Sequence, residues 1–233
     1  KQQVFNARVW HEISTHSQLR WQFNYTHSPY AYDAGGINDQ GVKENRKQAR
    51  LQNETYQTFE TVDHLKTGLQ WEKKINDKLS WDSYAFYAHR DFVGRLPYEF
   101  GGYVDLKRDY YGLGSALEFQ PKNNHRMQLR FSLADQKDHR KRFENIEGTP
   151  GENTLDQEEL FFNTALSFLD EFKWDFGILR AGLRYDHQRL GTQIGSDQVS
   201  LNTFNPSIGF TYTDWGKHVI FVSYSSSFET PTL

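Results

Sequence analysis

The sequence of 233 residues contains no cysteine, and its hydrophobic runs are short. The absence of cysteine excludes disulfide bonds, thiolate metal sites and a cysteine nucleophile. No stretch approaches the roughly 20 apolar residues of a transmembrane helix. Lys1 opens directly onto a strand-like pattern without a signal peptide. If the protein is exported, we expect its true N-terminus to be missing from this sequence.

A strong charge of one sign is also lacking, because 27 Lys and Arg oppose 30 Asp and Glu, which gives a net charge of -3. The basic run at residues 139–142 is short and is followed by acids. We therefore expect no nucleic acid as a partner.

Aromatic residues, in contrast, are abundant. They make up 16% of the sequence, yet the mean hydropathy is only -0.82. Few soluble domains combine so many rings with so low a hydropathy. A membrane β-barrel combines both, because alternate residues face lipid, the others face a wet lumen, and aromatic girdles mark the two interfaces.

Apolar and polar residues alternate with period two along the whole chain, which predicts strands. The clearest run places Leu19, Trp21, Phe23 and Tyr25 opposite Arg20, Gln22, Asn24 and Thr26. In two runs, at 79–92 and 103–119, Tyr and Phe occur in both registers, and Gly112 and Gly114 suggest close packing or bending. We predict about ten strands of roughly 10–16 residues each, long enough to cross a membrane at a tilt. The runs lie around 5–9, 19–26, 65–72, 79–92, 103–119, 127–133, 160–168, 179–186, 204–212 and 220–224.

The predicted connections alternate between short and long. Long segments rich in Gly, Asn, Asp, Gln and Arg are expected at about 28–55, 93–102, 140–156 and 190–199. Short polar turns are expected near Glu12–His16, Asn76–Lys78, Pro121–Asn124, Asp170–Lys173 and Asp214–Lys217. This asymmetry is typical of outer-membrane barrels, with the long loops outside. The predicted fold is all-β, an antiparallel meander of about ten long strands forming part of a transmembrane β-barrel.

No constellation for catalysis is found, so we predict no catalytic residues, no enzymatic activity and no cofactor. The run Ser225–Ser227 lacks the glycines of a nucleophile elbow, and no HExxH pattern occurs. Four of the nine histidines, His27, His89, His139 and His187, lie toward predicted outer strand ends. A metal site in the loops is conceivable there, but solvated or interface histidine is the default interpretation, and we assign no metal ligand.

The polar face of the predicted strands carries cations that would line the lumen: Arg20, Lys66, Arg126, Arg130, Arg180 and Arg184. Such an interior can attract anionic solutes, or can hold a folded plug through ion pairs and hydrogen bonds. The sequence does not separate these two roles.

Four segments together resemble the TonB-dependent outer-membrane receptors, which take up siderophores and other metal chelates. The most specific is 223–233, SYSSSFETPTL, and the next is 179–186, LRAGLRYD. Residues 31–36 with 45–50 resemble a Gly-Gly loop followed by an Arg-x-x-Ala-Arg cluster, and 89–92 with 104–112 resemble an Arg-Asp-Phe strand end followed by Val-Asp-Leu-x-Arg. The resemblance spans most of the chain.

The resemblance implies a barrel of about 22 strands blocked by an N-terminal plug, in the bacterial outer membrane. TonB would move the plug by pulling on a periplasmic segment. The expected partners are outer-membrane lipid, a ferric siderophore or similar large nutrient, and, in the full-length parent, its own plug domain and TonB. Residues 1–233 would be a partial barrel domain from which the plug is absent.

Rings and guanidinium groups in the predicted outer loops suit aromatic, anionic chelates. On residue type and placement, the candidate ligand contacts are Tyr30, Tyr32, Arg46, Arg50, Arg95 and Tyr98. An ordinary role as extracellular loop residues is an equally good interpretation of each.

Three other functions remain open. A passive porin or small self-contained barrel would pair residues 2–11 with 219–228. An outer-membrane enzyme would need converging Ser, His and Asp, or paired acids, near the outer rim. A soluble all-β binding module would bury the apolar face in a core.

Overall fold

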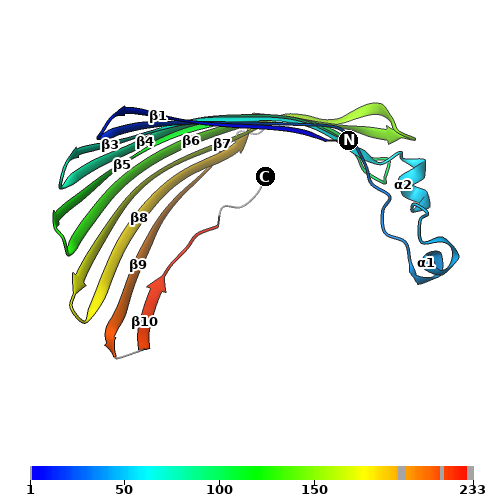
Figure 1. Cartoon of the computed structure of the whole chain (residues 1–233). Coiled ribbons are helices and arrows are strands. Elements are labelled where there is room, and N and C mark those ends of the chain that lie inside the picture. The colour runs from blue at the N-terminus through cyan, green and yellow to red at the C-terminus, as the bar shows by residue number, and fades with distance from the viewer. Residues whose placement is uncertain (1, 194–197, 216–217, 230–233) are drawn as a thin grey trace.

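The computed structural model describes residues 2–193, 198–215 and 218–229. They form one antiparallel sheet of ten strands, ordered β1 to β10 as in the sequence (Figure 1). The predicted meander and strand number are therefore confirmed. The strands are β1 Gln3–Ser14, β2 Ser17–Tyr32, β3 Phe59–Asn76, β4 Leu79–Arg95, β5 Tyr103–Lys122, β6 His125–Ile146, β7 Thr149–Trp174, β8 Gly177–Thr192, β9 Val199–Trp215 and β10 His218–Ser225.

The connections at the two ends of the sheet differ in length. Two-residue turns lie at 15–16, 77–78, 123–124 and 175–176, all at one end. At the other end, residues 33–58 carry the helices α1, Asp39–Asn45, and α2, Leu51–Thr55, and residues 96–102 form a shorter loop. Neither helix in the described chain has the length and apolarity needed to cross a membrane. The predicted segments 190–199 and 214–217 lie partly outside the described residues.

The predicted long loop at 140–156 is wrong. Strands β6 and β7 continue through it and meet in a two-residue turn at Glu147–Gly148. Both turn residues have positive φ, 48° and 93°, as a type I′ hairpin turn requires. In Figure 1 this hairpin extends beyond the other strands at the end that carries the helices.

The sheet is strongly curved (Figure 1). Because successive side chains of a strand point to opposite faces, the convex and the concave face carry different sets of residues. The convex face carries the predicted lipid-facing rows, and many of their large side chains are exposed, such as Leu69, Leu113 and Leu183 at 45%, 47% and 49%. Among the described residues, the buried hydrophobic side chains are only Val104, Ala116, Ala165 and Leu190. These residues do not form the apolar core that a soluble β-sandwich would need, so the exposed rows require apolar surroundings from outside the sheet.

Two inward glycines account for the ambiguous register of β4 and β5. Gly112 pairs with Phe86 and Gly114 pairs with Tyr84. A Cβ at Gly112 would lie 2.5 Å from the carbonyl oxygen of Leu133, and one at Gly114 would lie 2.5 Å from the Tyr84 ring. The predicted close packing is confirmed, because these two aromatic rings lie across the concave face where side chains are missing.

The sheet is open in the described part of the chain. β1 pairs with β2 and β10 pairs with β9, which leaves β1 and β10 as the two edges. The pairing of the first strand with the last, which a small self-contained barrel predicts, is not found there.

Candidate functional site

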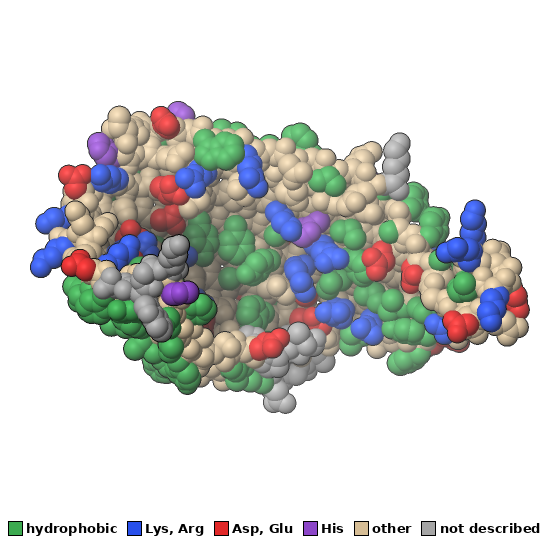
Figure 2. All heavy atoms as spheres, turned by 60° about the horizontal axis from the view of Figure 1, so that its bottom comes forward, with side chains coloured by type: hydrophobic (Ala, Val, Ile, Leu, Met, Phe, Trp, Pro, Cys, Tyr) green, Lys and Arg blue, Asp and Glu red, His purple; other side chains and the backbone are tan. Residues whose placement is uncertain are grey.

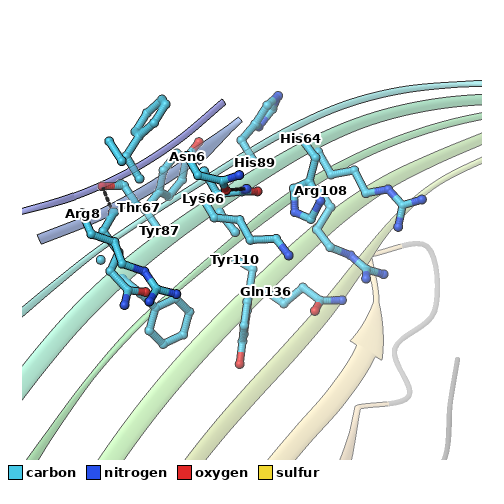
Figure 3. A pocket seen from close by; sticks show the side chains of 18 residues that line it. Asn6, Arg8, His64, Lys66, Thr67, Tyr87, His89, Arg108, Tyr110 and Gln136 are labelled. Atoms are coloured by element: carbon cyan, nitrogen blue, oxygen red, sulfur yellow. Dashed lines mark hydrogen bonds between the residues drawn. The ribbon is translucent and has the colours of Figure 1, made fainter. Parts of the chain in front are cut away.

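A hollow of about 1030 Å³ lies on the concave face across β1 to β6. Four cations line it, Arg8, Lys66, Arg90 and Arg108, and we call it the basic hollow. Figure 3 shows Lys66, Arg108, Tyr110 and Gln136 pointing to the same side of the sheet, and Figure 2 looks toward the concave face, where Lys and Arg side chains gather. The other polar residues that line it are Asn6, Gln22, Asn24, His64, Thr67, Tyr87, His89, Tyr110 and Gln136.

Strand register brings these cations together from distant parts of the sequence. Lys66 pairs with Asn24, and Arg90 pairs with both His64 and Arg108. Because side chains alternate between the faces of a strand, residues two apart share a face. Arg8, which pairs with Gln22, therefore points to the same face as Lys66.

Three of the four cations have no carboxylate partner in the part of the chain that the structure describes. Arg108 is held by Asp138, whose Oδ1 accepts a hydrogen bond of 2.7 Å from its Nε. In contrast, no described acidic residue forms an ion pair with Arg8, Lys66 or Arg90, and the buried Nε of Arg90 has no hydrogen-bond acceptor. The Arg90 guanidinium instead lies 5.2 Å from the centre of the Phe92 ring. The basic hollow thus carries uncompensated positive charge.

Nearer the short turns, most cations of the concave face are paired. Arg20 lies 3.0 Å from Glu72, Arg180 lies 2.6 Å from Glu171 and Arg184 lies 2.7 Å from Asp186. A second hollow of about 600 Å³ there is lined by Arg130 together with several acids. By strand register, the six predicted lumen cations all lie on the concave face: Arg20, Lys66, Arg126, Arg130, Arg180 and Arg184.

The six predicted ligand contacts lie in the loops and strand ends opposite the short turns, and they do not converge on one site. Tyr30 and Tyr32 stack on each other at the end of β2, with ring centres 6.4 Å apart. Arg95 lies over the Phe59 ring at 4.2 Å and donates a weak hydrogen bond of 3.4 Å to Gln57.

The other three predicted contacts lie apart. Arg50 precedes α2 and lines a loop cavity of about 540 Å³. Arg46 ends α1, and Tyr98 is exposed in the loop 96–102. Because none of the six lines the basic hollow, their role as ligand contacts stays a prediction.

A buried asparagine ties the outer loops together. Asn145, near the tip of the β6–β7 hairpin, is fully buried. Its Nδ2 donates to the carbonyl oxygens of Tyr56 and Leu96, each at 3.0 Å, and its Oδ1 accepts from the Gly148 amide at 2.8 Å. Its own amide donates to the carbonyl of Glu99. One side chain therefore joins the loop before β3, the loop before β5 and the hairpin.

Sequence reasoning missed Arg8, Arg90, Arg108 and Asn145. Arg8 alternates with Ala7 and Val9, so the sequence could have placed it on the polar face of its strand. Arg90 and Arg108 lie in the two runs where aromatic residues obscure the parity. A single asparagine in a polar segment gives no signal of burial. Among the described residues, no group of three or more His, Asp or Glu is placed to hold a metal ion.

The fold is shared with known transport proteins. The ferric citrate transporter FecA in its unliganded form matches with a TM-score of 0.79 at 15% identity, over 95% of this chain and 35% of its own. The FrpB iron transporter of Neisseria meningitidis matches with a TM-score of 0.71 at 12% identity, over 100% of this chain and 36% of its own. The siderophore receptor PiuA of Acinetobacter baumannii matches with a TM-score of 0.68 at 12% identity, over 96% of this chain and 41% of its own. The chain thus spans well under half the length of each.

A search of curated protein sequences finds no match. The profile of one family, described as "TonB dependent receptor-like, beta-barrel", matches residues 5–233, nearly the whole chain. It agrees with the open meander, the exposed convex rows and the polar concave face. The chain belongs to the TonB-dependent receptor β-barrel family.

Proposed function

We propose that this chain is part of an active receptor in the bacterial outer membrane that takes up a ferric siderophore or another anionic metal chelate. Residues 1–233 would contribute ten strands to its barrel domain, and the plug domain and TonB would be its partners in the full-length receptor. The observation that carries the proposal is the set of three unpaired cations, Arg8, Lys66 and Arg90, in the basic hollow.

Uncompensated cations on a curved wall attract anions more strongly than the same charges on a flat surface, because low-dielectric walls focus their field. At a separation of about 8 Å and an effective dielectric constant of about 40, one charge pair contributes roughly 1 kcal/mol. Each cation would then strengthen the binding of a chelate of charge -1 by about five-fold. A chelate with several negative charges would gain more.

The outer loops would make the first contacts with the chelate. The stacked Tyr30 and Tyr32 offer a flat aromatic surface, and Arg46, Arg50, Arg95 and Tyr98 add charge and hydrogen-bond donors. We keep these six residues as proposed ligand contacts. Unaltered chelate binding by a full-length receptor in which all six are replaced would remove them from the site.

The test uses full-length receptors that carry Arg8→Gln, Lys66→Gln or Arg90→Gln, each compared with Lys137→Gln. Lys137 pairs with Asp109 in register and lies on the convex face, so it is a matched cation outside the hollow. We expect the three hollow variants to weaken binding of an anionic ferric chelate by about five-fold each, with no effect on a neutral chelate. Equal losses for both chelates, or the same loss in Lys137→Gln, would refute an electrostatic role.

Two further readouts separate this proposal from its rivals. The same cations could hold carboxylates of a plug, and their removal would then make cells permeable to a large antibiotic that intact outer membranes exclude. A passive porin would take up the chelate without energy. We expect uptake to stop when a protonophore collapses the inner-membrane potential, and uptake that continues would contradict active transport.

A further inference from the structure

One pattern on the convex face recurs on three strand pairs. In each case a strand carries Tyr-x-His, and the next strand supplies one oxygen atom that bonds both side chains. The histidine lies directly opposite the residue that supplies the oxygen, and the tyrosine lies two residues nearer the short turns. We call each such group a Tyr-x-His unit. The units are Tyr25, His27 and Asp63; Tyr87, His89 and Asp109; and Tyr185, His187 and Asn202.

The contacts in the three units are nearly the same. Asp63 Oδ1 accepts from the Tyr25 hydroxyl at 2.9 Å and lies 2.6 Å from Nδ1 of His27. The corresponding distances at Asp109 Oδ1 are 2.6 and 2.8 Å, and at Asn202 Oδ1 they are 2.7 and 2.9 Å. Another tyrosine, Tyr111, donates to Asp135 at 2.7 Å without a histidine. The repetition shows a single structural device rather than three unrelated contacts.

The units descend across the sheet at a constant rate. When the register is followed from β2 through β3, the β4 residue in the same row as Tyr25 is His89. Tyr87, two strands away from Tyr25, therefore lies two residues nearer the short turns than this row. When the register is followed from β4 through β5, β6 and β7, the β8 residue in the same row as Tyr87 is Arg189. Tyr185, four strands away from Tyr87, therefore lies four residues nearer the short turns than this row. The line through the units therefore falls by one residue per strand.

This slope equals the tilt of strands in a membrane barrel. A rise of about 3.3 Å per residue and a strand spacing of about 4.8 Å give an angle of about 35° for a fall of one residue per strand. Strands of outer-membrane barrels tilt by about 35–45° from the barrel axis. A line with this slope is level with the membrane plane when the strands are tilted as a barrel requires.

The side chains change character at this line. On β5 and β6, the outward positions just beyond it are ionisable: Asp105, Lys107 and Asp109 on β5, and Asp135, Lys137, His139 and Lys141 on β6. At the far end of the two strands, Tyr103 and Phe143 form one outward aromatic pair. Toward the short turns, the outward positions from Tyr111 to Phe119 are aromatic, aliphatic or serine. The eight residues that separate Tyr111 from Phe119 cover about 26 Å of strand, or about 21 Å of height at this tilt. An outward apolar band in such barrels is about 25 Å tall.

We propose that the three Tyr-x-His units form a level belt in contact with the lipid headgroups of the outer leaflet, where the hydrocarbon layer ends. Tyrosine and histidine each carry an apolar ring and polar atoms, which suits this boundary. The shared acceptor on the next strand satisfies the tyrosine hydroxyl, which would otherwise lack a partner beside hydrocarbon. The proposal rests on the proposed outer-membrane location.

The test places single nitroxide labels on the full-length receptor, in vesicles of phosphatidylethanolamine and phosphatidylglycerol. Cysteine is absent from this chain, so no native thiol within residues 1–233 would compete for the label. The belt labels replace His27, His89 or His187. A second set replaces His27, Asp91 or His139, which share one register row. Leu183 and Lys141 give a deep and a water-exposed reference.

We expect equal membrane depth for the belt labels, within about 3 Å, and progressively shallower positions for Asp91 and His139. Relaxation of the lipid phosphorus-31 nuclei should be enhanced most by the belt labels. Equal depths at His27, Asp91 and His139, with His89 and His187 deeper, would overturn the level belt while leaving the outer-membrane proposal standing. Labels that are all water-exposed, Leu183 included, would overturn both.

Discussion

Replacing Asn145 tests whether one buried side chain holds the outer loops in place. In Asn145→Leu, the hydrogen bonds of the side chain to Tyr56, Leu96 and Gly148 are lost, while its backbone bond to Glu99 can persist. Each lost bond costs about 1 kcal/mol net, and buried groups left without a partner add to this, for about 3–5 kcal/mol in all. Since every 1.4 kcal/mol is tenfold, the opened state of the loops should become roughly 10² to 4 × 10³ times more populated.

Hydrogen exchange of backbone amides in the full-length receptor measures this change. We expect faster exchange at Leu96 and Gly102, whose amides donate within the loop 96–102, and at Gly148. Amides of β6 within the apolar band should not change. Asn153→Leu is the matched control, because Asn153 lies on the same hairpin, is exposed and has no side-chain hydrogen bond to the described residues.

The reasoning fails if Asn145→Leu leaves loop exchange unchanged, or if Asn153→Leu accelerates it equally. A receptor that no longer inserts would be uninformative on loop exchange alone. Asn145→Ser is therefore measured beside it, because serine can keep one of the hydrogen bonds. Its loops should exchange at a rate between those of the wild type and Asn145→Leu, and exchange faster than in Asn145→Leu would also refute the assignment.

Two other predictions concern the sheet and the hairpin. Gly112→Ala should lower the free energy of unfolding by about 1–3 kcal/mol in a urea titration of the refolded receptor, because its Cβ would meet the Leu133 carbonyl at 2.5 Å. Gly68→Ala, in the same register row with its nearest contact at 3.5 Å, should be neutral or slightly stabilising, and an equal loss there would refute the steric argument. A hydrogen bond from His139 lowers the pKa of Asp156 on the protruding hairpin. The contribution of this contact to the free energy of unfolding is therefore complete above the ordinary Asp pKa, and it is lost as the pH falls through the lowered pKa. The carbon-13 shift of the Asp156 carboxyl should titrate below its usual range and return toward it in His139→Leu.

The sequence was sufficient for the strands whose faces differ in character. From Leu19 to Tyr25, every second residue is a large apolar one, so the run had only one possible register. The β4 and β5 runs were ambiguous because Tyr84, Phe86 and Tyr110 face inward. Their rings are accommodated by glycines on the neighbouring strand, which is a property of pairing between strands.

The extension of the β6–β7 hairpin was not predictable by the same reasoning. Beyond the belt both faces of a strand meet water, so charged residues occupy both and the period of two disappears. The turn Glu147–Gly148 also lacks the Asn-Gly or Asp-Gly pair that usually marks a two-residue hairpin. The basic hollow could be predicted only in part. The alternation along β3 was enough to place Lys66 on the polar face. Whether a cation there has a carboxylate partner depends on which acids lie on the neighbouring strands, and the sequence alone does not show this.

The belt also fixes the height of the basic hollow. Falling by one residue per strand from Tyr25, the line crosses β3 at Lys66, whose side chain lies on the opposite, concave face. Arg90 lies three residues beyond Tyr87 on the outer side, so the unpaired cations are distributed around the level of the proposed membrane boundary. Charges in water act over about 8–10 Å at physiological salt. An anionic chelate would therefore come within reach of Lys66 and Arg90 as it entered the mouth of the barrel, before any movement of a plug is required. If the proposed function holds, the hollow would at this height be better suited to capturing a ligand than to holding it deep in the lumen.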